Sequence, residues 1–160
     1  MGIRYFALPV PPQLVNIAST NPRAFLSGRH FWESWSDPPD QPAGLFLDKS
    51  WWDMQQLLCG RENEPPRAAY ELVRGAVTQY GYGWIPFDRV LSAKKVAAVA
   101  KDLAAVDLSE LYQAHSHSFS PDWAAIMEGR RDYIERYLSD AKKFTAQLAG
   151  QGLGLIYSIG

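Results

Sequence analysis

Residues 153–159, Leu-Gly-Leu-Ile-Tyr-Ser-Ile, form a short and nearly continuous apolar run after Gly152, close to the C-terminal end of the chain. A run of this kind is typical of a strand that is covered on both faces. Near the other end, residues 3–8 read Ile-Arg-Tyr-Phe-Ala-Leu and stop at a proline, a composition that also favours a strand. We therefore expect an α+β fold in which the two terminal strands pair in one small sheet and several helices pack on it.

Pro11-Pro12 is expected to open a short helix, and Asn21-Pro22 another that Gly28 closes. Three further helices are expected before residue 107. Asp48 is expected to cap a helix through Leu58, and the proline pair at residues 65–66 to begin a second helix that ends at Arg74. Ser92 is expected to cap a third helix, because the residues that follow it repeat apolar side chains at i, i+3, i+4 and i+7.

The remaining chain contains one more helical pattern and one aromatic stretch. Ser120, followed by a proline and an acid, begins a long amphipathic pattern that ends at Gly150, and Gly129 could interrupt its first turns. Between residues 75 and 87, glycines and Pro86 divide a group of aromatic residues. This segment predicts a glycine-hinged loop or a ragged strand.

The bulk properties indicate one domain over residues 1–160, without internal repeats or a shift in composition. Sixteen basic and seventeen acidic residues give a net charge of -1, which argues against nucleic acid as a partner. Cys59 is the only cysteine, so an intrachain disulfide is excluded and a reducing compartment fits best. No apolar run approaches the ~18 residues of a membrane span and no signal peptide is recognisable. We expect a cytoplasmic protein that does not bind a membrane.

Motifs of common catalytic and cofactor sites are absent, including the nucleophile elbow and the P-loop. Gly81-Tyr82-Gly83 is followed by Trp84 and not by a helix with a third glycine, which favours turn glycines over a dinucleotide-binding loop. His115 and His117 would bind a metal only with a third ligand such as His30 or a carboxylate, so a solvated loop is the preferred interpretation. We expect neither a cofactor nor a metal site.

Aromatic residues are the least ordinary feature, with six Trp, eight Tyr and seven Phe. They are concentrated at residues 31–35, 51–52 and 80–87. Adjacent side chains on a helix point about 100° apart, so we expect either Trp51 or Trp52 to face a groove or a partner. Trp and Tyr contribute much of the binding energy at protein interfaces, which favours partner binding. Packing of these aromatic residues in the core explains the pattern equally well.

The leading hypothesis is a non-enzymatic binding or accessory protein whose aromatic groove engages a protein or a small ligand. The residues expected at this groove are Trp51, Trp52, Asp53, Tyr80, Tyr82 and Trp84. One alternative is a small enzyme with an acid/base cleft that uses Asp53 or Asp88, together with His115 and His117. Another is a structural homo-oligomer, such as a homodimer, that buries its tryptophans between copies. Taken alone, Asp53 is better explained as a solvated residue of its helix.

Two stretches, Leu47-Asp48-Lys49-Ser50-Trp51 and Leu57-Leu58-Cys59-Gly60, resemble the signature of the bacterial YfbM-like family, domain of unknown function 1877. Later landmarks of that family are matched in the same order by Gly81-Tyr82-Gly83, Val90-Leu91-Ser92, Pro121-Asp122-Trp123, Tyr137, Phe144 and residues 152–156. The resemblance spans essentially the whole chain, and it implies an α+β fold and a cytosolic bacterial protein without an established reaction. Many members carry histidines in the helix after the Asp-Lys pair, where this chain has Trp52 and Gln55, so chemistry that depends on them is not implied here.

Overall fold

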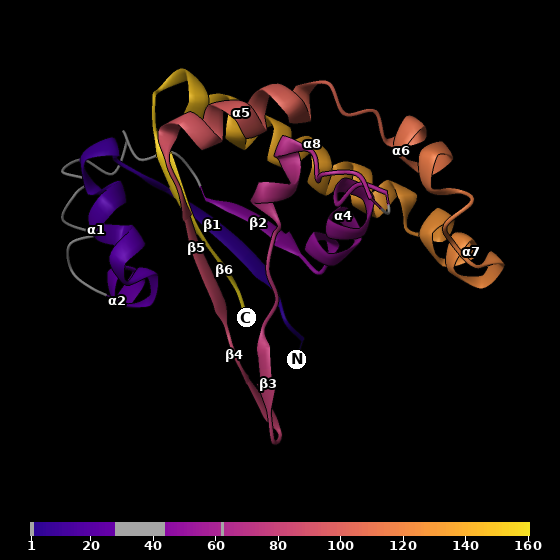
Figure 1. Cartoon of the computed structure of the whole chain (residues 1–160), viewed down its shortest axis with the longest axis horizontal. Coiled ribbons are helices and arrows are strands. Elements are labelled where there is room, and N and C mark those ends of the chain that lie inside the picture. Colours follow the sequence, from indigo (N-terminus) through magenta and orange to yellow (C-terminus); the bar gives the residue numbers. More distant parts are fainter. Residues whose placement is uncertain (1, 28–43, 62) are drawn as a thin grey trace.

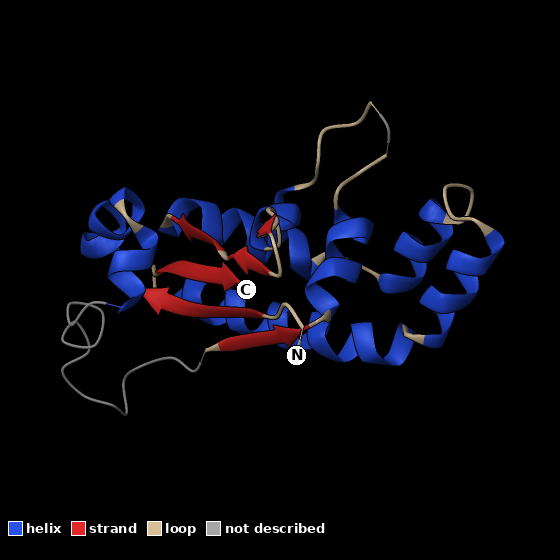
Figure 2. Cartoon of the chain, turned by 90° about the horizontal axis from the view of Figure 1, so that it is seen from below, coloured by secondary structure: helices blue, strands red, loops and turns tan. Residues whose placement is uncertain are grey.

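The computed structural model describes residues 2–27, 44–61 and 63–160. Its centre is a four-stranded antiparallel sheet in the order β2-β1-β6-β5 (Figures 1 and 2). The strands are β1 (Tyr5–Val10), β2 (Leu45–Asp48), β5 (Phe87–Leu91) and β6 (Gly154–Ile159). The two terminal strands lie side by side in the middle of the sheet, with Tyr5 opposite Ile159. The predicted pairing of the chain ends is therefore confirmed.

Strand β6 is buried along its whole length. Its side chains alternate between two hydrophobic clusters: Leu155, Tyr157 and Ile159 enter a large core, whereas Ile156 enters a smaller cluster with Phe25. Because both faces of the strand are covered, its sequence lacks the polar alternation of a half-exposed strand. This explains the continuous apolar run at the C-terminal end.

Helices cover the two faces of the sheet separately (Figure 1). The long helices α5 (Ala93–Ala104) and α8 (Arg131–Gly150) pack on the face of the large core. On the other face, a 3-10 turn η1 (Pro12–Leu14) leads into the short helices α1 (Val15–Thr20) and α2 (Pro22–Ser27). Helices between the terminal strands thus enclose the sheet, as the sequence predicts.

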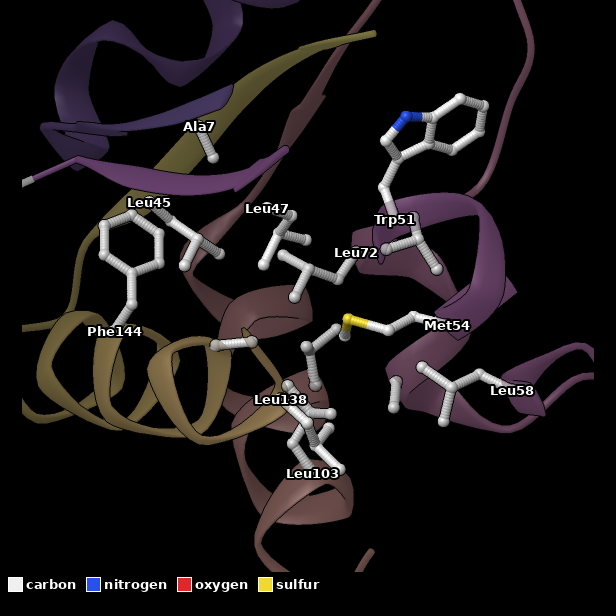
Figure 3. Packing of buried hydrophobic residues seen from close by; sticks show 14 of the residues in the cluster. Ala7, Leu45, Leu47, Trp51, Met54, Leu58, Leu72, Leu103, Leu138 and Phe144 are labelled. Carbon is white, nitrogen blue, oxygen red and sulfur yellow. The ribbon is translucent and has the colours of Figure 1, made fainter. Parts of the chain in front are cut away.

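The large core lies between the sheet, α5, α8 and α4 (Ser50–Leu58), and Figure 3 shows side chains from all of them converging. Leu47 of β2, Met54 of α4 and Leu103 of α5 are at most 1% exposed. Complete burial of such a side chain stabilises the fold by about 1.5–3 kcal/mol. This core fixes the position of α4 against the sheet.

Polar caps begin three of the C-terminal helices. The side chain of Ser92 accepts a hydrogen bond at the start of α5, that of Asp107 at α6 (Leu108–His115) and that of Ser120 at α7 (Pro121–Gly129). Helix α6 was not predicted from the sequence. The long pattern after Ser120 forms two helices, α7 and α8, which meet at Arg130, so the interruption expected at Gly129 is confirmed.

The helix predicted for residues 65–74 is wrong, because this segment forms only the 3-10 helix η3 (Ala68–Leu72). Its carbonyl groups accept hydrogen bonds from buried tyrosines of the sheet. The hydroxyl of Tyr5 donates to Leu72 O at 2.9 Å, and that of Tyr157 donates to Arg74 O at 2.7 Å. These tertiary hydrogen bonds hold the segment against the sheet. They also satisfy the two carbonyl groups, which therefore do not require the backbone hydrogen bonds of an α-helix.

Residues 75–87 form a β-hairpin arm and the start of β5, where the sequence predicted a glycine-hinged loop or a ragged strand. Strands β3 (Thr78–Tyr80) and β4 (Gly83–Ile85) pair with each other in a separate two-stranded sheet. After Pro86 the chain continues into β5, and Figure 1 shows the hairpin extending away from the body of the molecule. Gly81 lies in the turn with a φ of +50°, which supports its interpretation as a turn glycine, whereas Gly83 is the first residue of β4.

Candidate functional site

The two tryptophans of α4 have different environments. Trp51 is 7% exposed, and its indole Nε1 donates to Ile3 O at 3.5 Å. Trp52 is 42% exposed, and its ring packs edge-to-face on Trp123 of α7 with a centroid distance of 5.3 Å. One of the two adjacent rings therefore reaches the surface, as the helix geometry predicts. Trp51 belongs to the core and is not available to a partner.

The hairpin carries the most exposed aromatic side chains of the predicted groove. Tyr80 is 63% exposed and Tyr82, in the turn, is completely exposed. Trp84 and Ile85 of β4 are 37% and 51% exposed. These residues lie within one short antiparallel ribbon, in which Tyr80 is opposite Gly83. Because successive side chains of a strand point to opposite faces, Tyr80 and Ile85 lie on one face of this ribbon and Trp84 lies on the other, so each face of the hairpin carries large apolar side chains.

The five aromatic residues predicted to line one groove are distributed over the core, the α4–α7 contact and the hairpin. Four pockets of the described residues have volumes of about 220 to 460 Å³, and none of the five residues lines any of them. The structure therefore brings Tyr80, Tyr82 and Trp84 together in one element and gives Trp51 and Trp52 other neighbours.

Asp48 does not cap α4, which corrects the prediction from the sequence. Helix α4 follows Lys49 without a side-chain cap, and Asp48 is the last residue of β2 with a φ of +46°. A carboxylate oxygen of Asp48 accepts a hydrogen bond from the Tyr133 hydroxyl at 3.0 Å, and Arg4 Nε lies 3.4 Å from the other oxygen. The Asp48 side chain therefore contacts Tyr133 of α8 and Arg4, which precedes β1, and does not cap the helix that it was expected to begin.

Asp53 is buried, so its interpretation as a solvated helix residue is wrong. Its side chain is 2% exposed, and Arg130 at the α7–α8 junction donates from Nη2 to Asp53 Oδ2 at 2.6 Å. Burial raises the pKa of the Asp53 carboxyl above its ordinary value, while the charge and the hydrogen bond of Arg130 act in the opposite direction. The pair connects two elements of the helical side of the molecule.

The other residues of the acid/base alternative lie on different elements. Asp88 of β5 accepts a hydrogen bond from Arg23 Nε of α2 at 2.8 Å. His115 at the end of α6 is buried, with Nε2 3.0 Å from Leu57 O, whereas His117 is exposed. The pocket beside Asp88 and the pocket beside His115 have no residue in common. The interpretation of residues 115–117 as a solvated loop is therefore wrong for His115.

These acids and histidines do not gather into a metal site within the described part of the chain. No group of three or more His, Cys, Asp or Glu residues there has the arrangement to hold a metal ion. His30, named as a possible third ligand for His115 and His117, lies outside the described residues. Among the described helices, none is long and apolar enough to cross a membrane.

A groove between the edge strand β2 and α8 was missed by the sequence reasoning. It has a volume of about 460 Å³ and is lined by Phe46, which is 66% exposed, and by Tyr137, Arg136 and Lys143. Each of these residues is ordinary for a strand or an amphipathic helix. The groove arises from the spacing between β2 and α8, which no local pattern encodes.

Comparisons with known proteins place the chain in a family. A family model described as domain of unknown function (DUF1877) matches residues 3–158. A solved structure described as a protein of unknown function, YfbM from Escherichia coli, is similar with a TM-score of 0.56 and 16% identity, over 99% of this chain and 100% of that one. At this identity the likeness shows a common fold only, and no curated protein matches. Because the family model covers nearly the whole chain, the protein belongs to the DUF1877 family, as its sequence landmarks imply.

Proposed function

We propose that this chain is a binding protein and that the β3–β4 hairpin is the surface that contacts a protein partner. The observation that carries the proposal is the exposure of Tyr80, Tyr82, Trp84 and Ile85 on one projecting ribbon. Large apolar side chains scattered singly over a surface need no explanation, whereas a contiguous group of them is typical of an interaction site. Tyrosine and tryptophan are also the residues most enriched among interface hot spots.

The base of the hairpin is held firmly by the body of the molecule. Gln55 of α4 donates from Nε2 to Val73 O at 2.6 Å and to Gly75 O at 2.8 Å. Beyond this point Val77 packs on the large core, and the ring of Phe87 lies against Gly75. The arm therefore begins from a fixed position, which reduces the conformational entropy lost when its tip is bound.

A flat aromatic ribbon fits a protein surface better than a small ligand. Small-molecule sites are concave and bury most of the ligand, and none of the four pockets includes a residue between 75 and 85. An extended backbone with free edges can in addition pair with a strand of another chain. We expect burial of the aromatic side chains against the partner to provide most of the affinity.

Photocross-linking in cells of the source organism tests this proposal. A photoreactive phenylalanine analogue replaces Tyr82 in the hairpin or, as a control, Ile17 of α1, which is 59% exposed. We expect a discrete protein adduct from position 82 that disappears when Ile85→Ser is added, and no discrete adduct from position 17. Equal and diffuse labelling from both positions would show that the hairpin is ordinary surface.

A further inference from the structure

We infer that the partner of the hairpin is a second copy of this chain, and that two hairpins pack face to face around a two-fold axis. The inference rests on the proposed function, because it assigns the occupant of the same surface. Three observations support the inference: the hairpin arm has no charged side chain, one of its faces is suited to packing, and it is a small two-stranded ribbon.

The arm has no charged side chain. Between Arg74 and Asp88 the thirteen residues 75–87 contain no Asp, Glu, Lys, Arg or His. In a two-fold contact every surface meets its own copy near the axis, so a charge there faces an identical charge. A neutral arm avoids this repulsion. By contrast, a charged partner would lose hydration at this surface without meeting an opposite charge.

One face of the ribbon is suited to such packing. Thr78 pairs with Ile85 and Tyr80 pairs with Gly83, and side chains of directly paired residues lie on the same face. The hydroxyl end of the Tyr80 side chain lies beside Gly83, where a β-carbon would be 3.9 Å from Tyr80 Cζ and from its hydroxyl oxygen. The absence of a side chain at Gly83 thus leaves Tyr80 and Ile85 as a low, continuous surface that a second copy can cover.

The ribbon is small, so we expect that packing against a second copy would stabilise it. Its two strands have three residues each and pair with no other strand of the described chain. A two-stranded hairpin is marginally stable in water, and packing against a further layer is what makes such ribbons stable. Figure 1 shows the hairpin projecting beyond the body, so two arms can meet before the bodies collide.

Sedimentation equilibrium of the full chain over ~1–200 µM tests the inference, because self-association depends on concentration. Wild-type protein is expected to approach twice the mass of one chain. Ile85→Asp places like charges at the axis and should weaken association by at least about tenfold. Ile126→Asp on α7 is the matched control, because Ile126 is 49% exposed and Ile85 is 51% exposed, and it should leave the association unchanged. Circular dichroism checks folding, and Tyr80→Ser replaces Ile85→Asp if that variant does not fold.

The outcomes separate the inference from the proposed function. A wild-type chain that stays monomeric at the highest concentration overturns the second copy as partner. If position 82 then cross-links to a different protein, the hairpin remains a binding surface; if it cross-links to nothing, both proposals fail. A dimer that persists in both Ile85→Asp and Tyr80→Ser, or one that only Ile126→Asp disrupts, would use another surface and would also overturn the inference.

Discussion

Replacement of Arg130 by methionine isolates the contribution of the buried pair between α4 and the α7–α8 junction. The variant removes the guanidinium and keeps an apolar side chain that can still pack on Tyr133, whose ring lies 5.3 Å from the Arg130 guanidinium carbon. Among the described residues, Arg130 is the only hydrogen-bond partner of the Asp53 carboxylate. The substitution therefore leaves a side chain that is 2% exposed without its counter-charge.

The loss in the free energy of unfolding caused by Arg130→Met depends on how deeply the pair is buried and on how far water can reach Asp53. Removal of one partner of a fully buried ion pair costs about 3–5 kcal/mol, and an unsatisfied buried polar group costs about 1–3 kcal/mol. Because the Arg130 side chain is 40% exposed, its loss admits some water to Asp53. We therefore expect Arg130→Met to lower the free energy of unfolding at pH 7 by about 2–3 kcal/mol.

The pKa of Asp53 makes this loss depend on pH. Desolvation raises the folded-state pKa above the value of about 3.9 in an unfolded chain. Stability from such a group is fully present below the unfolded pKa and is lost as pH rises through the folded pKa. Loss of Arg130 removes the influence that lowers this pKa, so Arg130→Met should cost less at about pH 4 than at pH 7. Because asparagine does not titrate, the cost of Arg130→Met in the Asp53→Asn variant should not show this dependence on pH.

Urea unfolding, followed by tryptophan fluorescence and circular dichroism, measures these free energies. In the Asp53→Asn background, Arg130→Met should cost at least about 1 kcal/mol less than in the wild type, because no charge is then stranded. Arg136→Met on the exposed side of α8 is the control and should change stability by less than about 0.5 kcal/mol. Equal costs of Arg130→Met in both backgrounds and at both pH values would refute the account of this pair.

Three further substitutions test the fold. Leu47→Ala, at a completely buried position, should lower the free energy of unfolding by about 2–5 kcal/mol in the same urea assay; a loss below about 1 kcal/mol would show that the core rearranges. Gly75→Ala should destabilise by about 1–3 kcal/mol, because Gly75 has a φ of +118° and a β-carbon there would lie 2.2 Å from the Phe87 ring; a thermal melt at the wild-type midpoint would contradict this. Ser120→Ala should cost about 0.5–2 kcal/mol through loss of the α7 cap, and an unchanged midpoint would show that this helix end frays already.

The sequence predicts those features that local patterns determine. The run at residues 153–159 indicates a strand covered on both faces, and that strand is β6 in the middle of the sheet. Ser92 and Ser120 begin helices because capping is a property of a few neighbouring residues. The angle between Trp51 and Trp52 likewise follows from helix geometry, and one ring does reach the surface.

Features that depend on distant residues could not be predicted in this way. Asp53 has the appearance of a first-turn acid, and only its contact with Arg130, 77 residues away, explains its burial. The 3-10 helix η3 reflects hydrogen bonds from Tyr5 and Tyr157 of the sheet. The separation of the predicted groove residues has the same cause, since the positions of α4 and the hairpin are set by the tertiary fold.

The central claim is that the hairpin is covered by a protein in the cell. Its most direct test is the reaction of N-ethylmaleimide with Tyr82→Cys, measured in intact cells of the source organism and in dilute purified protein, both in a Cys59→Ala background. Ile17→Cys on α1 is the control for reagent entry. We predict that position 82 reacts at least about tenfold more slowly in cells than in dilute solution, whereas position 17 reacts at similar rates. Equal reactivity of position 82 under both conditions would contradict the account.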